Sequence, residues 1–185
     1  MTVVLVTVYL AAIVAANLII AELGPSAAIP VAFALVGLDL TTRDALHDRW
    51  DGAGLLPRMV ALIGAGGVLS WIVNADAGPV AVASTVAFVA AAVADTVVYR
   101  ALGDRAHLLR INGSNVAGAT VDSLLFIPLA FGVIMPTVML AQLAAKIAGG
   151  AVWSVVLRAL EYRSVSLEEG APMSAGDFVL YLRVR

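Results

Sequence analysis

The strongest constraint on this chain is a succession of long apolar runs with almost no charged residue. The first run, residues 3–21, contains no Asp, Glu, Lys or Arg, and a helix of this length at about 1.5 Å per residue nearly crosses a ~30 Å hydrocarbon core. Five further runs follow, at residues 26–38, 59–73, 79–94, 116–133 and 137–157. Charged residues make up only 13% of the 185 residues, against about 25% in soluble domains. We therefore predict an all-α membrane protein with six transmembrane helices.

The second run is the shortest of the early runs and contains Pro30. Because proline removes a helical hydrogen bond, we expect either a tilted span that extends through Thr42 or a broken element held in the protein interior. Only residues 134–136 separate the fifth and sixth runs. This predicts a tight turn between two antiparallel neighbours.

The basic residues indicate the orientation of the chain. Arginines follow the second, fourth and sixth runs, whereas the connections after the first, third and fifth runs contain no Lys or Arg. The positive-inside rule then places both termini in the cytoplasm, in agreement with an even number of spans. We expect a multi-pass protein of the cytoplasmic membrane, with a six-helix domain at residues 1–160 and a cytoplasmic tail at 161–185.

Composition and motifs argue against several classes of function. The chain has no cysteine, which excludes thiolate metal sites and cysteine nucleophiles, and its net charge of −2 argues against a nucleic-acid partner. HExxH and P-loop motifs are absent from the sequence. We expect no catalytic residue, no metal and no cofactor. A group of acidic residues, Asp44, Asp48 and Asp51, leaves a membrane-embedded metal-dependent transferase as an alternative.

Polar residues inside the spans indicate a binding function. An Asp or Lys at the centre of a spanning helix costs about 2.5–3.5 kcal/mol, so we expect Asp122 and Lys146 to face the protein interior. Three stripes at helical spacing combine polar and aromatic residues: Ser84, Phe88, Ala91 and Asp95; Asn115, Gly118, Asp122 and Phe126; Gln142, Lys146, Gly149 and Trp153. Aromatic faces stack on heterocycles and a carboxylate accepts paired N–H donors, so these stripes favour a small planar ligand. The alternative is an Asp122–Lys146 pair that only neutralises two buried charges.

A second group of polar residues lies at the cytoplasmic ends of the spans. Asp39 and Arg43 close the second run, either as a solvated helix end or as the polar lip of a cytoplasmic mouth. Residues 112–115, which include Ser114, are typical of a turn and helix N-cap; the alternative is a helix N-terminus at the mouth that offers free N–H groups to a ligand. Asn17 is assigned either to this gating region or to a helix–helix hydrogen bond.

The ordered set of these residues resembles a known family. Asp39-Leu40-Thr41-Thr42-Arg43 at the end of the second span, Asp95, Ser114-Asn115, Asp122-Ser123 and Lys146 are similar in order and spacing to the vitamin-uptake-like or queuosine precursor transporters. The resemblance covers about residues 5–160. It implies uptake of the 7-deazaguanine precursors preQ0 or preQ1, and a fold similar to the substrate-binding subunits of energy-coupling-factor transporters.

The resemblance and the stripes together define the candidate site. The substrate-binding candidates are Asp95, Asn115, Asp122, Gln142, Lys146, Phe88, Phe126 and Trp153. The candidates for gating or the cytoplasmic mouth are Asp39, Arg43, Ser114 and Asn17. The expected partners are a deazapurine, the lipid bilayer and a second copy of the chain in a homodimer. A substrate-capturing subunit that needs an ATPase partner, with a vitamin or another small heterocycle as its ligand, and a purely structural bundle stay open as alternatives.

Overall fold

The computed structural model describes residues 2–50, 54–103, 105 and 107–169, which are helical apart from short connections. The longer helices are α1 (Thr2–Leu23), α3 (Gly37–Arg49), α4 (Leu55–Val73), α5 (Gly78–Ala101), α6 (His107–Phe131) and α7 (Pro136–Glu169). Short helical segments precede α3 and α5, namely η1 (Pro25–Ala27), α2 (Ala28–Val31), η2 (Ala32–Val36) and η3 (Ala75–Ala77). The predicted all-α class is confirmed.

The described helices match the predicted membrane spans in order. Five stretches are long and apolar enough to cross a membrane: Thr2–Leu23, Pro25–Arg43, Ala75–Ala101, Gly113–Phe131 and Pro136–Leu157. The remaining predicted span falls in α4, whose apolar part, Pro57–Val73, is slightly shorter. The whole of α4 has 19 residues, or about 28 Å at 1.5 Å per residue. The chain is thus a multi-pass membrane protein.

The second span is irregular, as the sequence predicts. It begins with the single 3₁₀ turn of η1, passes through α2, and widens into the π-helical turn of η2 before α3 continues to Arg49. Pro30 lies in α2, directly before the π-helical turn. Because proline cannot donate a backbone hydrogen bond and crowds the preceding turn, a local change of helical pitch relieves the strain. The helix also continues past Thr42, so the second span combines the extension and the irregularity that the sequence analysis gave as alternatives.

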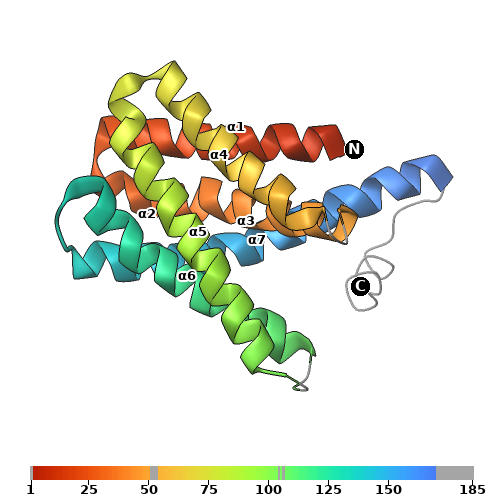
Figure 1. Cartoon of the computed structure of the whole chain (residues 1–185). Helices are drawn as coiled ribbons and strands as arrows, with labels where there is room; N and C mark the ends of the chain where they lie inside the picture. The colour runs from red at the N-terminus through yellow and green to blue at the C-terminus, as the bar shows by residue number, and fades with distance from the viewer. Residues whose placement is uncertain (1, 51–53, 104, 106, 170–185) are drawn as a thin grey trace.

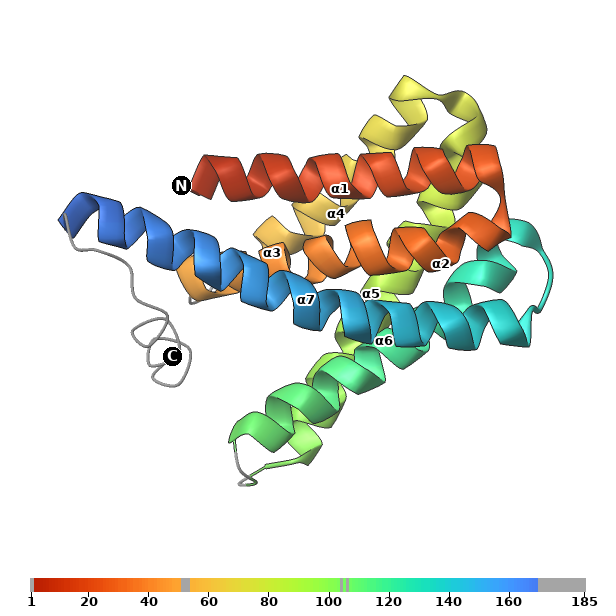
Figure 2. The same cartoon turned by 180° about the vertical axis from the view of Figure 1, so that it is seen from behind.

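The α5–α6 hairpin forms one part of the bundle and packs against the other helices through α4 and α7. Figure 2 shows α1, the α2–α3 segment and α7 side by side, with α5 and α6 crossing behind them. The most extensive packing in the structure is between α5 and α6, and far less of α6 contacts α7. As Figure 1 shows, the connected end of this hairpin, between Ala101 and His107, lies away from α1 and α3. The predicted tight turn is confirmed, since α6 ends at Phe131 and α7 begins at Pro136.

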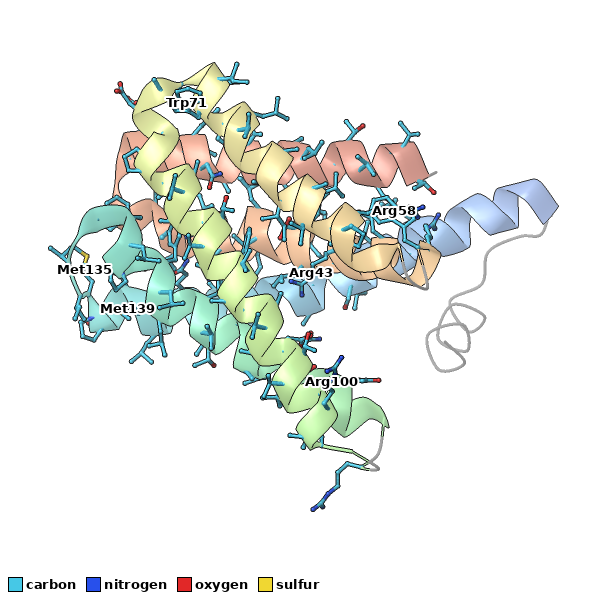
Figure 3. The ribbon with its side chains drawn as sticks, in the orientation of Figure 1. Arg43, Arg58, Trp71, Arg100, Met135 and Met139 are labelled. Atoms are coloured by element: carbon cyan, nitrogen blue, oxygen red, sulfur yellow. The ribbon has the colours of Figure 1, made fainter. Side chains whose placement is uncertain are left out.

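The two ends of the bundle differ in their side chains. Figure 3 shows Arg58 at one end and Trp71 and Met135 toward the other, with Arg100 near the free end of the α5–α6 hairpin. The N-terminus of α1 and the last turns of α7 (Figure 1) lie toward the same end as Arg58 (Figure 3). We call this the arginine end. From the distribution of arginines we predict that this end faces the cytoplasm.

Two apolar clusters fill the interior between the helices. One lies at the arginine end and joins α1, α3 and α4 through Tyr9, Leu46 and Met59. The other lies toward the opposite end and joins α1, α5, α6 and α7, with Phe126 and Ile127 among its members. The clusters leave the space between α3, α5, α6 and α7 near the arginine end without a large apolar filling, and this space holds the candidate site.

Two local features of the structure differ from the sequence predictions. Residues 112–115 do not form a turn and helix N-cap, because α6 already begins at His107 and runs through them; the helix is extended N-terminally by a further turn and more, so their N–H groups lie within helical structure. The predicted tail begins inside α7, which is helical to Glu169. Residues 170–185 lie outside the described residues, and the domain boundary at residue 160 stays a prediction.

Candidate functional site

Two cavities lie inside the bundle on either side of the same three side chains. The large cavity has a volume of about 470 Å³ and lies between α3, α5, α6 and α7. The small cavity has a volume of about 20 Å³ and lies deeper, among α1, η2, α3, α5, α6 and α7. Phe88, Asp122 and Lys146 line both cavities. These three residues therefore form the wall between the two spaces.

An ion pair between α6 and α7 forms the polar part of this wall. Lys146 donates to the carboxylate of Asp122 and also to the hydroxyl of Ser123, whose Oγ lies 3.2 Å from Nζ. Lys146 is only 2% exposed. A buried charge needs both a counter-ion and hydrogen-bonding partners, and the adjacent residues Asp122 and Ser123 provide them. The pair is the one predicted from the sequence, and space remains on both sides of it.

Asp95 is a carboxylate of the large cavity whose hydrogen bonding is incomplete. Its carboxylate atom Oδ1 is buried and has no hydrogen-bond partner among the described residues. Asn115 of α6 lines the same cavity and is exposed. Gly118 lets α6 approach α5 closely, because a Cβ at this position would lie 3.2 Å from the carbonyl oxygen of Ala91. The short distance between the helices brings the predicted Asp95 and Asn115 to one cavity.

The polar residues at the end of the second span are divided between the two cavities. Arg43 lines the large cavity, whereas Asp39, which is one turn earlier on α3, lines the small cavity and is 3% exposed. Side chains four residues apart lie on the same helical face, so Asp39 and Arg43 lie along one face of α3, each beside a different cavity. Their predicted position at a cytoplasmic mouth fits Arg43 better than Asp39, which lies at the depth of the small cavity.

The remaining predicted polar residues lie deep in the structure. Gln142 is 2% exposed and lines the small cavity, and its Oε1 has no hydrogen-bond partner among the described residues. Asn17 lines the same cavity and donates from Nδ2 to Ser70 Oγ at 3.0 Å. This bond joins α1 to α4, so Asn17 makes the helix–helix contact that the sequence left as one of two interpretations. Ser114 is buried and lines neither cavity.

The three predicted aromatic residues have different surroundings. Phe88 contributes to the wall, and Phe126 lines only the small cavity. Trp153 lines neither cavity, because its indole N–H donates to the carbonyl oxygen of Ala34 at 2.7 Å. Ala34 lies in the π-helical turn of η2. The hydrogen bond from Trp153 therefore links the irregular second span to α7. The geometry favours Phe88 as the ring that faces a ligand in the large cavity.

The sequence analysis missed part of the face that α7 presents to the large cavity. The cavity is lined along α7 by Lys146, Gly150 and Ser154, which are spaced four residues apart. The predicted stripe instead continued from Lys146 to Gly149 and Trp153. Both stripes have helical spacing. After Lys146 they are offset by one residue, which corresponds to a rotation of about 100° around the helix axis. The small residue Gly150 and the hydroxyl of Ser154 were a signal for the correct face.

The close contact of Gly149 explains this rotation. A Cβ at Gly149 would clash with the backbone of Phe33 in η2, and a Cβ at Gly37 would lie 2.6 Å from the carbonyl carbon of Gly149. Two helices can approach this closely only where both present small residues. Gly149 therefore faces the second span, and the neighbouring Gly150 faces the cavity.

The fold and the site define a multi-pass membrane protein with an internal cavity that is lined by both apolar and charged residues. The cavity has the size that holds a small molecule, since such sites measure about 300–1,000 Å³. Residues 54–161, more than half of the chain, match the model of the family described as "Putative vitamin uptake transporter". The chain belongs to this vitamin uptake transporter family. No curated protein and no solved structure matches the chain.

Family membership establishes the general type of function. The chain is a membrane transporter of the vitamin-uptake type, as the sequence resemblance implied. The matched region includes the cavity residues of α5, α6 and α7. The polar residues of α3, including Asp39 and Arg43, lie before it.

Proposed function

We propose that the chain imports a 7-deazaguanine precursor of queuosine, preQ0 or preQ1, across the cytoplasmic membrane. The observation that carries this proposal is the buried Oδ1 of Asp95, which has no partner among the described residues and borders a cavity of about 470 Å³. A buried carboxylate oxygen without a donor is costly. A ligand that supplies the missing N–H donor in this cavity recovers that cost on binding.

The guanine-like edge of a deazaguanine suits this carboxylate. Its ring N–H and exocyclic amine donate two parallel hydrogen bonds, which one carboxylate accepts as a charge-assisted pair. Asp122 is the other carboxylate of the cavity, but it already accepts from Lys146. We therefore assign recognition of the edge to Asp95, and we assign to Lys146 and Asn115 the contacts with the ring carbonyl and the remaining polar atoms.

Phe88 provides the apolar part of the proposed site. It lines the large cavity on α5, two turns before Asp95, so a ring and a carboxylate lie on one helical face. Stacking of a base on an aromatic side chain is worth about 1–3 kcal/mol. A planar heterocycle that stacks on Phe88 and bonds to Asp95 uses both interactions at once, whereas an ion uses only one.

The position of the large cavity supports uptake into the cytoplasm. Its polar residues Arg43, Asp95 and Asn115 lie in the halves of α3, α5 and α6 nearer the arginine end. If this end is cytoplasmic, as the arginines indicate, the structure corresponds to the state from which the substrate leaves. The ion pair and Phe88 then close the path on the opposite side.

The test is a binding titration of the purified protein with preQ0, preQ1, guanine, biotin and riboflavin, followed by uptake in vesicles without ATP. We expect binding of the two deazaguanines at concentrations at least about tenfold below those of biotin and riboflavin, which is the effect of a single charge-assisted hydrogen bond. Uptake without ATP supports a carrier. Binding of a deazaguanine without uptake would indicate a substrate-capturing subunit, and binding of only biotin or riboflavin would overturn the proposed substrate.

A further inference from the structure

The small cavity has the size of a site for one water molecule. Its volume is about 20 Å³, and a cavity needs about 10–15 Å³ and two to four polar partners to hold a water. Polar side chains from five helices line this space, namely Asn17, Asp39, Ser84, Asp122, Gln142 and Lys146. The small cavity therefore meets both requirements of a buried hydration site.

Gln142 needs a hydrogen-bond donor inside this cavity. It is 2% exposed, and its carbonyl oxygen Oε1 is buried without a partner among the described residues. A buried amide oxygen without a donor is costly, and native proteins satisfy such groups with protein atoms or with ordered water. Gln142 lines the small cavity and not the large one, so the donor has to lie in the small cavity.

Lys146 has a hydrogen-bonding capacity that its protein partners do not use up. An ammonium group carries three N–H donors, and Lys146 makes two hydrogen bonds among the described residues, to Asp122 and to Ser123. It follows Gln142 by four residues on α7 and lines the same cavity, so the two side chains project from one helical face. A third N–H thus lies next to the space in which the Gln142 oxygen needs a donor.

These two requirements together identify the ligand. One small group has to accept a hydrogen bond from Lys146 and donate one to Gln142. A metal cation cannot accept and a halide cannot donate, whereas water does both. Water also satisfies either orientation of the Gln142 amide, because it pairs with an N–H as well as with a carbonyl oxygen.

We propose that the small cavity binds one water molecule, which donates to Gln142 and accepts from Lys146. Gln142 is then a positioning residue, because through this water it holds the ammonium group that pairs with Asp122 in the wall of the large cavity. The inference goes beyond the proposed function, since it applies whichever small molecule the large cavity binds.

The composition of the chain allows a direct spectroscopic test. Gln142 is the only glutamine and Lys146 the only lysine among the 185 residues. Protein labelled with nitrogen-15 in the glutamine side chain and at the lysine Nζ, reconstituted in lipid, therefore gives one amide signal and one ammonium signal. We expect the amide protons of Gln142 to show a cross peak to water with the sign of a dipolar contact and not of chemical exchange. Because Gln142 is 2% exposed, this cross peak reports a water in the interior.

A substitution that fills the cavity tests the site without removing either polar side chain. Ala16 of α1 lines the small cavity and is 7% exposed, so Ala16→Val places two additional carbon atoms where the water lies. The cross peak should be lost, and the Nζ signal of Lys146 should shift because the ammonium loses an acceptor. The control Ala11→Val makes the same substitution on the exposed face of the same helix and should leave both signals unchanged.

Gln142→Met tests the positioning role. Methionine keeps the length of the side chain and lacks the amide, so the Nζ signal of Lys146 should shift in the same direction as in Ala16→Val. Elution as a single species in gel filtration shows that each variant has folded. Ala12→Val, one turn earlier on α1 and also lining the small cavity, provides a second filled variant.

Each outcome decides one part of the proposal. The absence of a cross peak in the wild type, or its persistence in both filled variants, would overturn the water site. An unchanged Lys146 signal in Gln142→Met would overturn the positioning role. A wild-type cross peak that disappears when sodium is replaced by choline would assign the cavity to a hydrated metal ion and would also overturn the proposal. None of these measurements requires uptake of a deazaguanine, so the proposed function is tested separately.

Discussion

Lys146 and Asp122 form an ion pair at the point where the large and small cavities meet, and both residues line both spaces. The pair is thus buried without being enclosed by packed apolar side chains. A pair whose role is only to neutralise two buried charges needs no space beside it. Its position between two cavities connects the stability of the α6–α7 contact to the passage of a ligand.

Removal of one partner of this pair should affect both stability and transport. Asp122→Asn leaves the Lys146 ammonium buried with Ser123 as its remaining hydrogen-bond partner among the described residues, and we expect a loss of stability of about 3 kcal/mol together with a loss of uptake. The measurements are thermal unfolding in detergent and uptake of labelled precursor at matched membrane levels.

The double variant Asp122→Asn with Lys146→Met separates the two effects. It removes both charges, so the folded protein should recover most of the lost stability, while uptake should stay absent because the polar wall is gone. Full uptake by the double variant would show that the pair serves only packing. Wild-type uptake by Asp122→Asn alone would contradict a role of the pair in transport.

Asp95→Asn should behave in the opposite way. Oδ1 of Asp95 has no hydrogen-bond partner among the described residues, and a buried carboxylate oxygen without a donor is costly. The substitution should therefore leave the unfolding temperature unchanged or raise it. Substrate affinity should fall about 10- to 100-fold, since a charge-assisted bond contributes about 1.5–3 kcal/mol. Isothermal titration with the deazaguanine measures the affinity. An unchanged Kd in Asp95→Asn would remove this residue from the site.

Much of the fold follows from local rules that one sequence contains. Uncharged runs define the spans, Pro30 predicts the irregular second span, and Pro136 predicts the turn before α7. The start of α6 was predicted wrongly at residues 112–115, because Gly113 and its polar neighbours are typical of a turn, whereas helix packing in the structure continues through them. Propensity is weak compared with such tertiary contacts.

The sequence predicts that several polar residues lie in the interior, but it does not predict how these residues are divided between the two cavities. Burial of Asp122 and Lys146 follows from the cost of charge in a membrane. The separation of Arg43 into the large cavity and of Asp39 into the small cavity depends on the crossing of η2 and α7 at Gly149. Such a crossing sets the rotation of each helix, and the spacing of residues along one helix does not determine it.

The aromatic residues give a paired prediction about the ligand. Phe88→Leu keeps an apolar side chain at the wall but removes the ring face, so affinity for a planar substrate should fall by about 1 kcal/mol or more, which is at least fivefold. Trp153→Phe removes the indole N–H that bonds to Ala34, so it should lower stability by about 1 kcal/mol and leave affinity unchanged. Titration and thermal unfolding on both variants make the comparison. A larger loss of affinity in Trp153→Phe than in Phe88→Leu would reverse the assignment.

Two adjacent glycines of α7 test the crossing that sets the site. Gly149→Ala places a methyl group against the backbone of Phe33, which cannot move as a flexible side chain can, and should destabilise the protein by about 1–3 kcal/mol. Gly150→Ala meets no atom within 4 Å and should be neutral or stabilising by up to about 1 kcal/mol. Thermal unfolding compares the two variants directly. Equal unfolding temperatures would contradict the close contact at Gly149.

The orientation of the large cavity can be tested by cysteine labelling, because the chain has no native cysteine to give a background. Ser26→Cys lies in η1, exposed at the end opposite the arginines, and should react with a membrane-impermeant maleimide in intact cells. Asn115→Cys lines the large cavity and is exposed, so it should react only in inverted vesicles. Bound substrate should slow the second reaction, since it occupies the same space. Reaction of Asn115→Cys in intact cells and not in inverted vesicles would reverse the orientation that the arginines assign, and it would turn the described conformation into one that receives substrate from outside.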